Sequence, residues 1–196
     1  FLINLIILLK YLFITFLFFN GYSFSQENIF DPILNAQTIK INKKGFKKIF
    51  NRTETEYISI IFLAIDCPIS QKYMNRLKEL RLLYNNKISF HFYLTGQTNR
   101  SEKIEFIENY ALDFDLYIDH KNKKAKHLGA KVTPEVFLLD QEYTIHYNGA
   151  IDNWFYSLGK NRNLITSHYL EDAMNSLLNG TKIQIPYVQA IGCYIE

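Results

Sequence analysis

The sequence predicts an α/β domain in which a mixed sheet is flanked by helices. Hydrophobic residues make up 48% of the 196 residues and charged residues 21%, which is ordinary for a folded globular protein. The run Tyr57–Ile65 is rich in β-branched and aromatic residues, with little polar alternation, as in a strand buried on both faces. Downstream, apolar runs alternate with segments of helical spacing, and this alternation indicates strands and helices packed in layers.

The first half of the domain is predicted as two strand–helix pairs. After the first strand, apolar residues recur at spacings of three and four, which marks one face of an amphipathic helix: Tyr73, Met74, Leu77, Leu80 and Tyr84. Lys87–Leu94 is the second strand. Ser101–Tyr110 is the second helix, with Ser101 as its N-cap, because a serine side chain accepts a hydrogen bond from a free N–H of the first turn.

The second half begins with a short predicted strand, Phe114–Ile118, and a short basic helix, Lys121–Leu128. Gly129 closes this helix, since glycine readily adopts the left-handed conformation of a helix end. Val136–Asp140 and Tyr143–Asn148 are predicted to form an antiparallel pair joined by a tight turn.

The last helix is predicted at Thr166–Asn179, with Gly180 as its C-terminal stop. Its inward-facing residues are Leu170, Ala173, Met174, Leu177 and Leu178. Beyond it, Ile183–Tyr187 is expected to be extended, and Gly192 permits a turn before Cys193.

The N-terminus has the pattern of an export signal. Residues 1–19 carry one charge, Lys10, and are otherwise almost wholly apolar, and Ser23 and Ser25 occupy positions −3 and −1 of a signal-peptidase cut. The stretch also suits a membrane-spanning helix, which needs about 20 apolar residues. We therefore expect either a signal peptide at 1–25 or a retained anchor. Both export the remaining chain to the periplasm or cell envelope of a bacterium.

Charge and cysteine content exclude several classes of function. The net charge of +3 gives no argument for nucleic acid as a partner, and membrane contact is expected only through residues 1–19 if they are retained. Two cysteines cannot build a four-cysteine zinc or iron–sulfur site. The histidines lack the spacing of a metal site, so neither a metal nor a cofactor is predicted. Since disulfides persist outside the cytoplasm, the cysteines are considered first as redox groups.

Cys67 carries the strongest chemical signal. It lies where a buried strand ends and a helix begins, and Pro68 suits the first helical turn because its missing N–H is not needed there. A thiol at a helix N-terminus faces unpaired N–H groups, which lower the pKa of a cysteine from about 8.5. Asp66 either opposes the thiolate by its charge or caps the helix. The alternative is that Cys67 is a small buried core residue.

A second motif, Val132–Asp140 (VTPEVFLLD), follows about 65 residues later. Pro134 cannot donate to a strand ladder, so its place before a strand indicates a special turn, often with a cis peptide bond. Together with a Cys-Pro pair at a helix start, this motif resembles the thioredoxin-like superfamily. More narrowly, it resembles the exported redoxin proteins of the alkyl hydroperoxide reductase/thiol-specific antioxidant group. Tyr147–Asp152 is similar to their Tyr-x-Gly-x-Ile-Asp stretch, and the likeness covers about residues 57–180.

The resemblance implies a thioredoxin-like fold with a mixed central sheet, and it implies three substrate-binding residues: Pro68, Thr133 and Pro134. Pro134 would be a cis proline packed beside Cys67, and the backbone of Thr133 would pair with a docked substrate strand. Residues 26–180 would form the redoxin domain, and 181–196 a C-terminal tail that carries Cys193. We call residues 181–196 the tail.

The chain departs from the superfamily's known patterns at four positions. Ser70 stands where thioredoxins have the second cysteine of Cys-x-x-Cys, so no dithiol forms within that motif. Ala64 and Ile60 stand where peroxiredoxins have the threonine and proline that shape the peroxide pocket. Gln71 takes the place of the second cysteine of copper-delivery relatives. Neither a peroxidase nor a copper carrier therefore follows from the resemblance alone.

Cys193 is the second cysteine of the chain. A Gly-Cys pair in the tail is similar to the ends of exported redoxins. We hypothesise that the tail folds back so that Cys193 resolves a sulfenic acid or mixed disulfide formed on Cys67. The alternatives are a tail cysteine without a partner or one that pairs between chains. A disulfide needs Cα atoms within about 7 Å, and the sequence does not determine that distance.

Three functions remain open. The first is a thiol-based oxidoreductase with antioxidant character, in which Cys67 attacks a disulfide or hydroperoxide and Cys193 or an external thiol resolves the product. Its partners would be a protein thiol or disulfide, or a small peroxide, and a reductant that the sequence does not identify. The second is a binding module that keeps the thioredoxin fold without catalysis. The third is a metal-handling module using Cys67 and a histidine.

Overall fold

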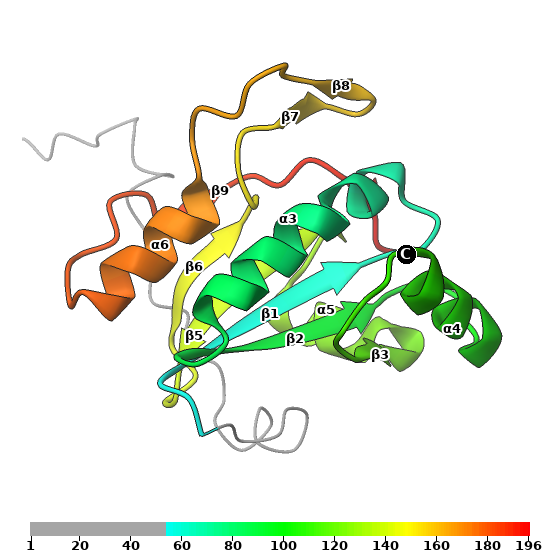
Figure 1. The fold of residues 1–196 in the computed structure, drawn as a ribbon, viewed down its shortest axis with the longest axis horizontal. Coiled ribbons are helices and arrows are strands. Elements are labelled where there is room, and N and C mark those ends of the chain that lie inside the picture. The colour runs from blue at the N-terminus through cyan, green and yellow to red at the C-terminus, as the bar shows by residue number, and fades with distance from the viewer. Residues whose placement is uncertain (1–53) are drawn as a thin grey trace, which may run out of the picture. The chain divides into compact units, whose positions relative to one another are not determined.

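The computed structural model describes residues 54–196 (Figure 1). The signal peptide or anchor predicted at 1–25, and the first part of the predicted domain 26–180, lie outside the described residues. In the described part of the chain, no helix combines the length and the apolar character needed to cross a membrane.

A mixed six-stranded sheet forms the centre of the domain, with the strand order β3-β2-β1-β5-β6-β9. Its strands are β1 (Tyr57–Leu63), β2 (Ile88–Leu94), β3 (Leu116–Ile118), β5 (Glu135–Asp140), β6 (Ile145–Gly149) and β9 (Tyr187–Val188). β1, β2 and β3 are parallel, β5 is antiparallel to β1 and β6, and β9 is parallel to β6. The predicted mixed sheet is confirmed.

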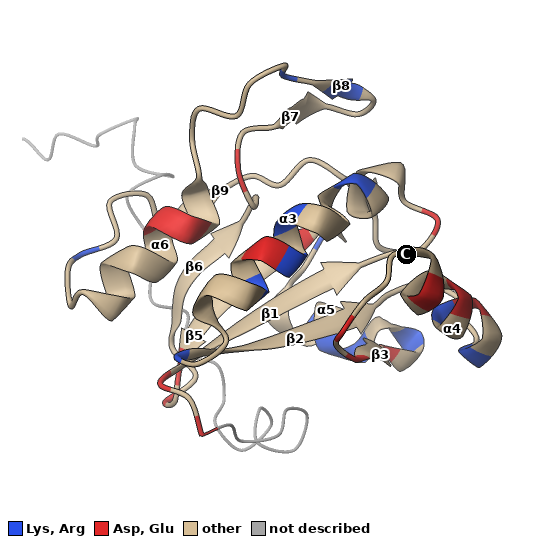
Figure 2. Cartoon of the chain, viewed as in Figure 1, with Lys and Arg blue, Asp and Glu red and all other residues tan. Residues whose placement is uncertain are grey.

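The two faces of the sheet bury alternate side chains of the same strands. In β1, Ile61 and Leu63 join one buried cluster, and Ile60 and Phe62 join the other. The first cluster packs against α3 (Pro68–Tyr84), α4 (Arg100–Asn109) and α6 (Tyr169–Leu178), and the second against α5 (Lys123–Leu128). Most acidic and basic side chains lie on the helices and loops, and β1 and β2 carry none (Figure 2). Burial on both faces explains the unbroken apolar run of the first strand.

The prediction that Ser101 caps the second helix is wrong. α4 begins at Arg100, and its N-cap is Asn99. The side-chain oxygen of Asn99 accepts a hydrogen bond from the Glu102 N–H at 3.0 Å, and the Glu102 carboxylate accepts one from the Asn99 N–H at 2.8 Å. This reciprocal capping box satisfies two backbone donors at once, so the helix starts one residue earlier than predicted.

The last helix, α6, starts at Tyr169, three residues later than predicted. The N–H groups of Thr166 and Ser167 donate to the side-chain oxygen of Asn153, at 3.0 and 3.2 Å. These bonds hold the segment in the loop that follows a small hairpin, made of β7 (Phe155–Ser157) and β8 (Lys160–Asn161). Side chains therefore compete with the helix for the backbone donors and delay its start.

The predicted basic helix is split into η1 (His120–Asn122) and α5. Lys121 and Asn122 have positive φ angles of 57° and 52°, which a continuous helix does not allow. Gly129 ends α5 with a φ of 76°, as predicted. β5 and β6 form the predicted antiparallel pair.

After α6 the tail returns to the edge of the sheet as β9 and then reaches β4 (Val132–Thr133) as β10 (Cys193–Tyr194). The segment Ile183–Tyr187 was expected to be extended, but only its last residue, Tyr187, lies in a strand. A Cβ on Gly149 would lie 1.8 Å from the Val188 carbonyl oxygen, so only glycine permits the contact between β6 and β9. Figure 1 shows the tail, in red, leading to the C-terminus beside the ends of β1 and β2.

Candidate active site

Cys67 is the N-cap residue of α3, directly after the loop that leaves β1. Its backbone N–H donates to the Ala64 carbonyl at 3.2 Å, and its carbonyl accepts the first helical bond from Gln71 at 3.0 Å. Pro68 occupies the first helical position and is exposed, whereas Cys67 is only 1% exposed. The predicted strand-to-helix position of the cysteine is therefore found, with the thiol below the surface. Asp66 is exposed and does not cap the helix, because the cap position belongs to Cys67.

The Thr133-Pro134 peptide bond is cis, and Pro134 is buried. The Cys67 thiol donates to the Thr133 carbonyl oxygen, with 3.1 Å between sulfur and oxygen. The loop at Thr133 therefore lies against the sulfur, as the resemblance implied. Two segments 66 positions apart in sequence meet at this contact.

The tail brings the second cysteine to the same place. β10 pairs antiparallel with β4, which sets Cys193 opposite Thr133. The Thr133 hydroxyl donates to the Cys193 carbonyl at 3.5 Å, and the Ile195 N–H donates to the Lys131 carbonyl at 3.0 Å. Cys193 packs against the buried cluster that contains Cys67, and both cysteines are free.

Gly192 makes the close approach of the tail possible. A Cβ at this position would lie 2.1 Å from the carbonyl oxygen of Thr133 and 2.6 Å from its carbonyl carbon. Both atoms belong to the backbone, so no side-chain rotation would relieve the overlap. The missing side chain of Gly192 therefore determines how near Cys193 comes to β4.

The surroundings shift the pKa values of the two thiols in opposite directions. Burial raises the pKa of Cys67, but the thiol and backbone of Cys193 and the backbone and hydroxyl of Ser70 stabilise the thiolate, and the resulting pKa lies below its ordinary value. Burial, the contact with Cys67 and the charge of Asp66 raise the pKa of Cys193 to about 12. The site thus holds one thiol with a lowered pKa beside one with a raised pKa.

Glu135 is a buried carboxyl next to the cis proline, and the sequence reasoning missed it. Its Oε2 accepts hydrogen bonds from the backbone N–H groups of Lys131, at 2.7 Å, and Val132, at 3.2 Å. Burial raises its pKa. These bonds fold the loop that presents Thr133 to Cys67. The signal was a charged residue directly before the apolar run of β5, Val136–Leu139.

The Tyr-x-Gly-x-Ile-Asp stretch, Tyr147–Asp152, helps to hold α3 in place. Asp152, at its end, accepts hydrogen bonds from the Tyr73 hydroxyl at 2.6 Å and from the Trp154 N–H at 2.8 Å. Tyr73 belongs to α3, so the carboxylate ties this helix to the loop after β6. The motif therefore supports the helix whose first turn carries Cys67.

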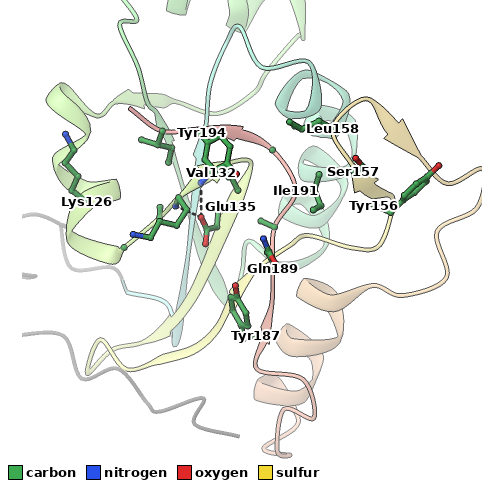
Figure 3. A pocket seen from close by; sticks show the side chains of 16 residues that line it. Lys126, Val132, Glu135, Tyr156, Ser157, Leu158, Tyr187, Gln189, Ile191 and Tyr194 are labelled. Carbon is green, nitrogen blue, oxygen red and sulfur yellow. Dashed lines mark hydrogen bonds between the residues drawn. The ribbon is translucent and has the colours of Figure 1, made fainter. Parts of the chain in front are cut away.

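An open groove of about 770 Å³ lies beside the tail (Figure 3). The tail residues Gln189, Ile191 and Tyr194 line it together with Glu135 and with the β7–β8 hairpin, represented by Tyr156 and Leu158. Neither cysteine lines this groove. Among residues 54–196, no group of three or more His, Cys, Asp or Glu side chains is arranged to hold a metal ion.

No protein-family model and no curated protein matches the sequence. Solved structures do match. A hypothetical protein of Sinorhizobium meliloti is 22% identical with a TM-score of 0.64, covering 72% of this chain and 79% of its own. An uncharacterized conserved protein of Geobacillus kaustophilus is 22% identical with a TM-score of 0.62, covering 72% and 77%. A thioredoxin-like protein in its oxidized form is 14% identical with a TM-score of 0.51, covering 65% and 81%.

These similarities define the class of fold. The mixed sheet, the helices on both faces and the likeness to a solved thioredoxin-like protein show that the chain has a thioredoxin-like fold. The fold predicted from the Cys-Pro and Val-Thr-Pro motifs is thereby confirmed.

Proposed function

We propose that this protein is a thiol-based oxidoreductase of the redoxin type, with Cys67 as the nucleophile and Cys193 as the resolving thiol. The observation that carries the proposal is that both cysteines meet at Thr133: the Cys67 thiol donates to its carbonyl oxygen, and Cys193 pairs opposite it in the β4–β10 ladder. The pKa of Cys67 is lowered and that of Cys193 is raised. A thiolate is the attacking form in disulfide exchange and in peroxide reduction. Cys193 must lose its proton before the second step, and the part of its raised pKa that comes from Cys67 disappears once Cys67 is oxidised.

With a disulfide as oxidant, the Cys67 thiolate attacks one sulfur and releases the other half as a thiolate. Cys193 then gives up its proton and attacks the Cys67 sulfur, which releases the second half. With a hydroperoxide, the thiolate attacks the terminal oxygen and becomes a sulfenic acid, while the departing alkoxide or hydroxide takes up a proton. Cys193 condenses with the sulfenic acid and water leaves. Both routes end in a Cys67–Cys193 disulfide, which an external dithiol reduces.

Cys193 would replace the thiol that thioredoxins keep inside their Cys-x-x-Cys motif. Ser70 occupies that position here and is fully buried, and its hydroxyl accepts a hydrogen bond from the Ala64 N–H at 3.3 Å. It supports the loop and the thiolate but has no redox chemistry. The dithiol is thus assembled from two distant parts of the chain.

We further propose that the protein acts after export, in the periplasm or cell envelope. The support is the signal-like pattern of residues 1–25 together with a pair of cysteines suited to an oxidising compartment. Its reductant would be a dithiol protein of the same compartment.

A catalytically silent binding module is the second candidate. The observation in its favour is that Cys67 is only 1% exposed beneath the docked tail. Such a protein would keep both thiols free in the presence of oxidants.

Non-reducing peptide mapping distinguishes the two functions. The purified protein is treated briefly with hydrogen peroxide or with a low-molecular-weight disulfide, alongside the variants Cys67→Ser and Cys193→Ser. We expect a Cys67–Cys193 disulfide that a mild reductant removes. We expect a sulfenic acid or mixed disulfide to persist on Cys67 in Cys193→Ser, and no reaction in Cys67→Ser. Two thiols that stay free under both oxidants would overturn the proposal in favour of the binding module.

A further inference from the structure

We propose that the docked tail decides which substrates reach Cys67: it admits low-molecular-weight oxidants and excludes extended polypeptides. The inference rests on the proposed function and adds the substrate class. It follows from what the tail occupies, from how it is held, and from how deeply it buries the nucleophile.

The tail occupies a strand edge that a polypeptide substrate would need. An extended chain commonly binds by adding a strand to an exposed edge, where its backbone groups find partners. The backbone of Thr133 contacts the Cys67 sulfur, since its carbonyl oxygen is 3.1 Å from Sγ. β4 already pairs there with β10, which places Cys193 opposite Thr133. A second strand therefore finds this edge filled.

The tail is held on both sides of Gly192. Upstream, the Asn148 and Ala150 N–H groups donate to the Pro186 and Val188 carbonyls, at 3.1 and 2.9 Å. Downstream, the Asn122 side-chain amide donates to the Glu196 carbonyl at 2.6 Å. Contacts at both ends keep the middle of the tail over the cysteine, so its release requires breaking bonds at one end at least.

Burial favours small oxidants in the docked state. Cys67 is 1% exposed, and Cys193 is the more exposed of the two. A small movement of side chains is enough to pass a compact oxidant, whereas a polypeptide needs the length of an extended strand beside the sulfur. The docked tail should thus discriminate by size and not by reactivity.

The test compares two substrates with the same leaving group. One is a single blocked cysteine joined by a disulfide to a chromogenic aryl thiol. The other is a linear peptide of about ten residues whose central cysteine carries the same group, long enough to pair as a strand. In each case the Cys67 thiolate forms a disulfide with the cysteine sulfur and releases the aryl thiolate, which is measured by its absorbance. The readout is the ratio of the two second-order rate constants.

Three variants accompany the native chain. Gly192→Ala pushes a methyl group into the Thr133 backbone and should release the tail. Gln189→Ala is the matched control, since Gln189 is an exposed tail residue without such a contact. Ile195→Pro replaces the N–H that donates to the Lys131 carbonyl with a proline ring carbon, so it also loosens the tail, and it replaces Gly192→Ala if that variant fails to fold.

Each rate constant is first divided by the rate constant of the same reagent with a free small thiol. In the native chain and in Gln189→Ala we then expect the single-cysteine substrate to react at least about tenfold faster than the peptide substrate. In Gly192→Ala and Ile195→Pro the ratio should approach one, mainly through a faster reaction of the peptide. Equal rates in the native chain, or an unchanged ratio in a variant whose tail is shown by limited proteolysis to be released, would overturn this inference alone. Release of aryl thiol that does not depend on Cys67, seen as an unchanged rate in Cys67→Ser, would instead overturn the proposed function.

Discussion

The two cysteines lie in parts of the molecule that are built differently. Cys67 belongs to the junction of β1 and α3, where the strand is buried along nearly its whole length and the helix packs on the sheet through Met74 and Leu77. Cys193 belongs to the tail, whose β10 has two residues and pairs with a strand of two residues. Apolar burial holds the junction around Cys67 in place, whereas a few backbone hydrogen bonds hold the tail around Cys193. This difference suits the proposed reaction, in which Cys67 stays in place and only Cys193 must move.

The largest expected effect lies in the junction. Leu77→Ala removes a fully buried side chain of α3 and should lower the free energy of unfolding by about 2–5 kcal/mol, because the core loses apolar burial and gains a cavity. Urea unfolding measures it. Leu82→Ala, on the same helix but 72% exposed, should stay within about 0.5 kcal/mol of the native chain. Similar losses in both variants would contradict a helix fixed by burial.

A smaller effect is expected where the tail leaves the sheet. Gly149→Ala places a Cβ 1.8 Å from the Val188 carbonyl oxygen and should cost about 1–3 kcal/mol by separating β9 from β6. Gly180→Ala is the control, since Gly180 also has a positive φ but has no atom near its Cβ position. Hydrogen exchange should show faster exchange of the Ala150 N–H, which donates to Val188, in Gly149→Ala only. Protection at this amide in both variants would argue against a tail anchored by β9.

The next effect is chemical and concerns the link between the two regions. Cys193→Ala removes the thiol that donates to Cys67, so the pKa of Cys67 should rise, and its alkylation by iodoacetamide should need a higher pH. Cys193→Ser is the matched control, because its hydroxyl still donates. The midpoint of its pH profile of alkylation should stay as low as in the native chain. Peptide mapping assigns the alkylated residue. A midpoint that is the same in both variants and the native chain would show that Cys193 does not act on Cys67.

The smallest effect is a dependence of stability on alkaline pH. Cys193 in the docked tail keeps its proton up to a pKa of about 12, whereas in the unfolded chain it loses it near its ordinary value of 9.0. As pH rises through this interval, the unfolded state binds fewer protons than the folded state, so the free energy of unfolding should fall. Cys193→Ser lacks this titration. The difference in unfolding free energy between the native chain and this variant should therefore decrease between pH 9 and 11, and a constant difference would contradict the raised pKa.

Local signals were enough to predict the junction. Pro68 after Cys67, the apolar run before it and the helical spacing after it all depend on neighbours in sequence, and the structure has each of them. The resemblance to the thioredoxin-like superfamily implied that Pro134 is a cis proline, and its peptide bond is cis.

The tail was harder to predict, because its position depends on contacts with distant segments. Gly192 fits the backbone of Thr133, and Gly149 fits that of Val188, but a glycine in the sequence does not say which backbone comes near it. The late start of α6 has the same reason, because the Asn153 side chain that delays it lies 13 positions before Thr166. The sequence therefore did not decide among three states of Cys193: docked on Cys67, without a partner, or paired with another chain.

The short pairing of β10 with β4 also bears on how this protein behaves at high concentration. An edge that accepts this tail accepts the identical tail of a second copy, since every contact at the edge would be the same. A segment tethered to its own domain has an effective concentration of the order of millimolar, so in dilute solution each domain binds its own tail. In reduced samples that approach this concentration we expect the tails to exchange between copies. Oxidation would then trap reciprocal dimers joined by two disulfides, each between Cys67 of one chain and Cys193 of the other.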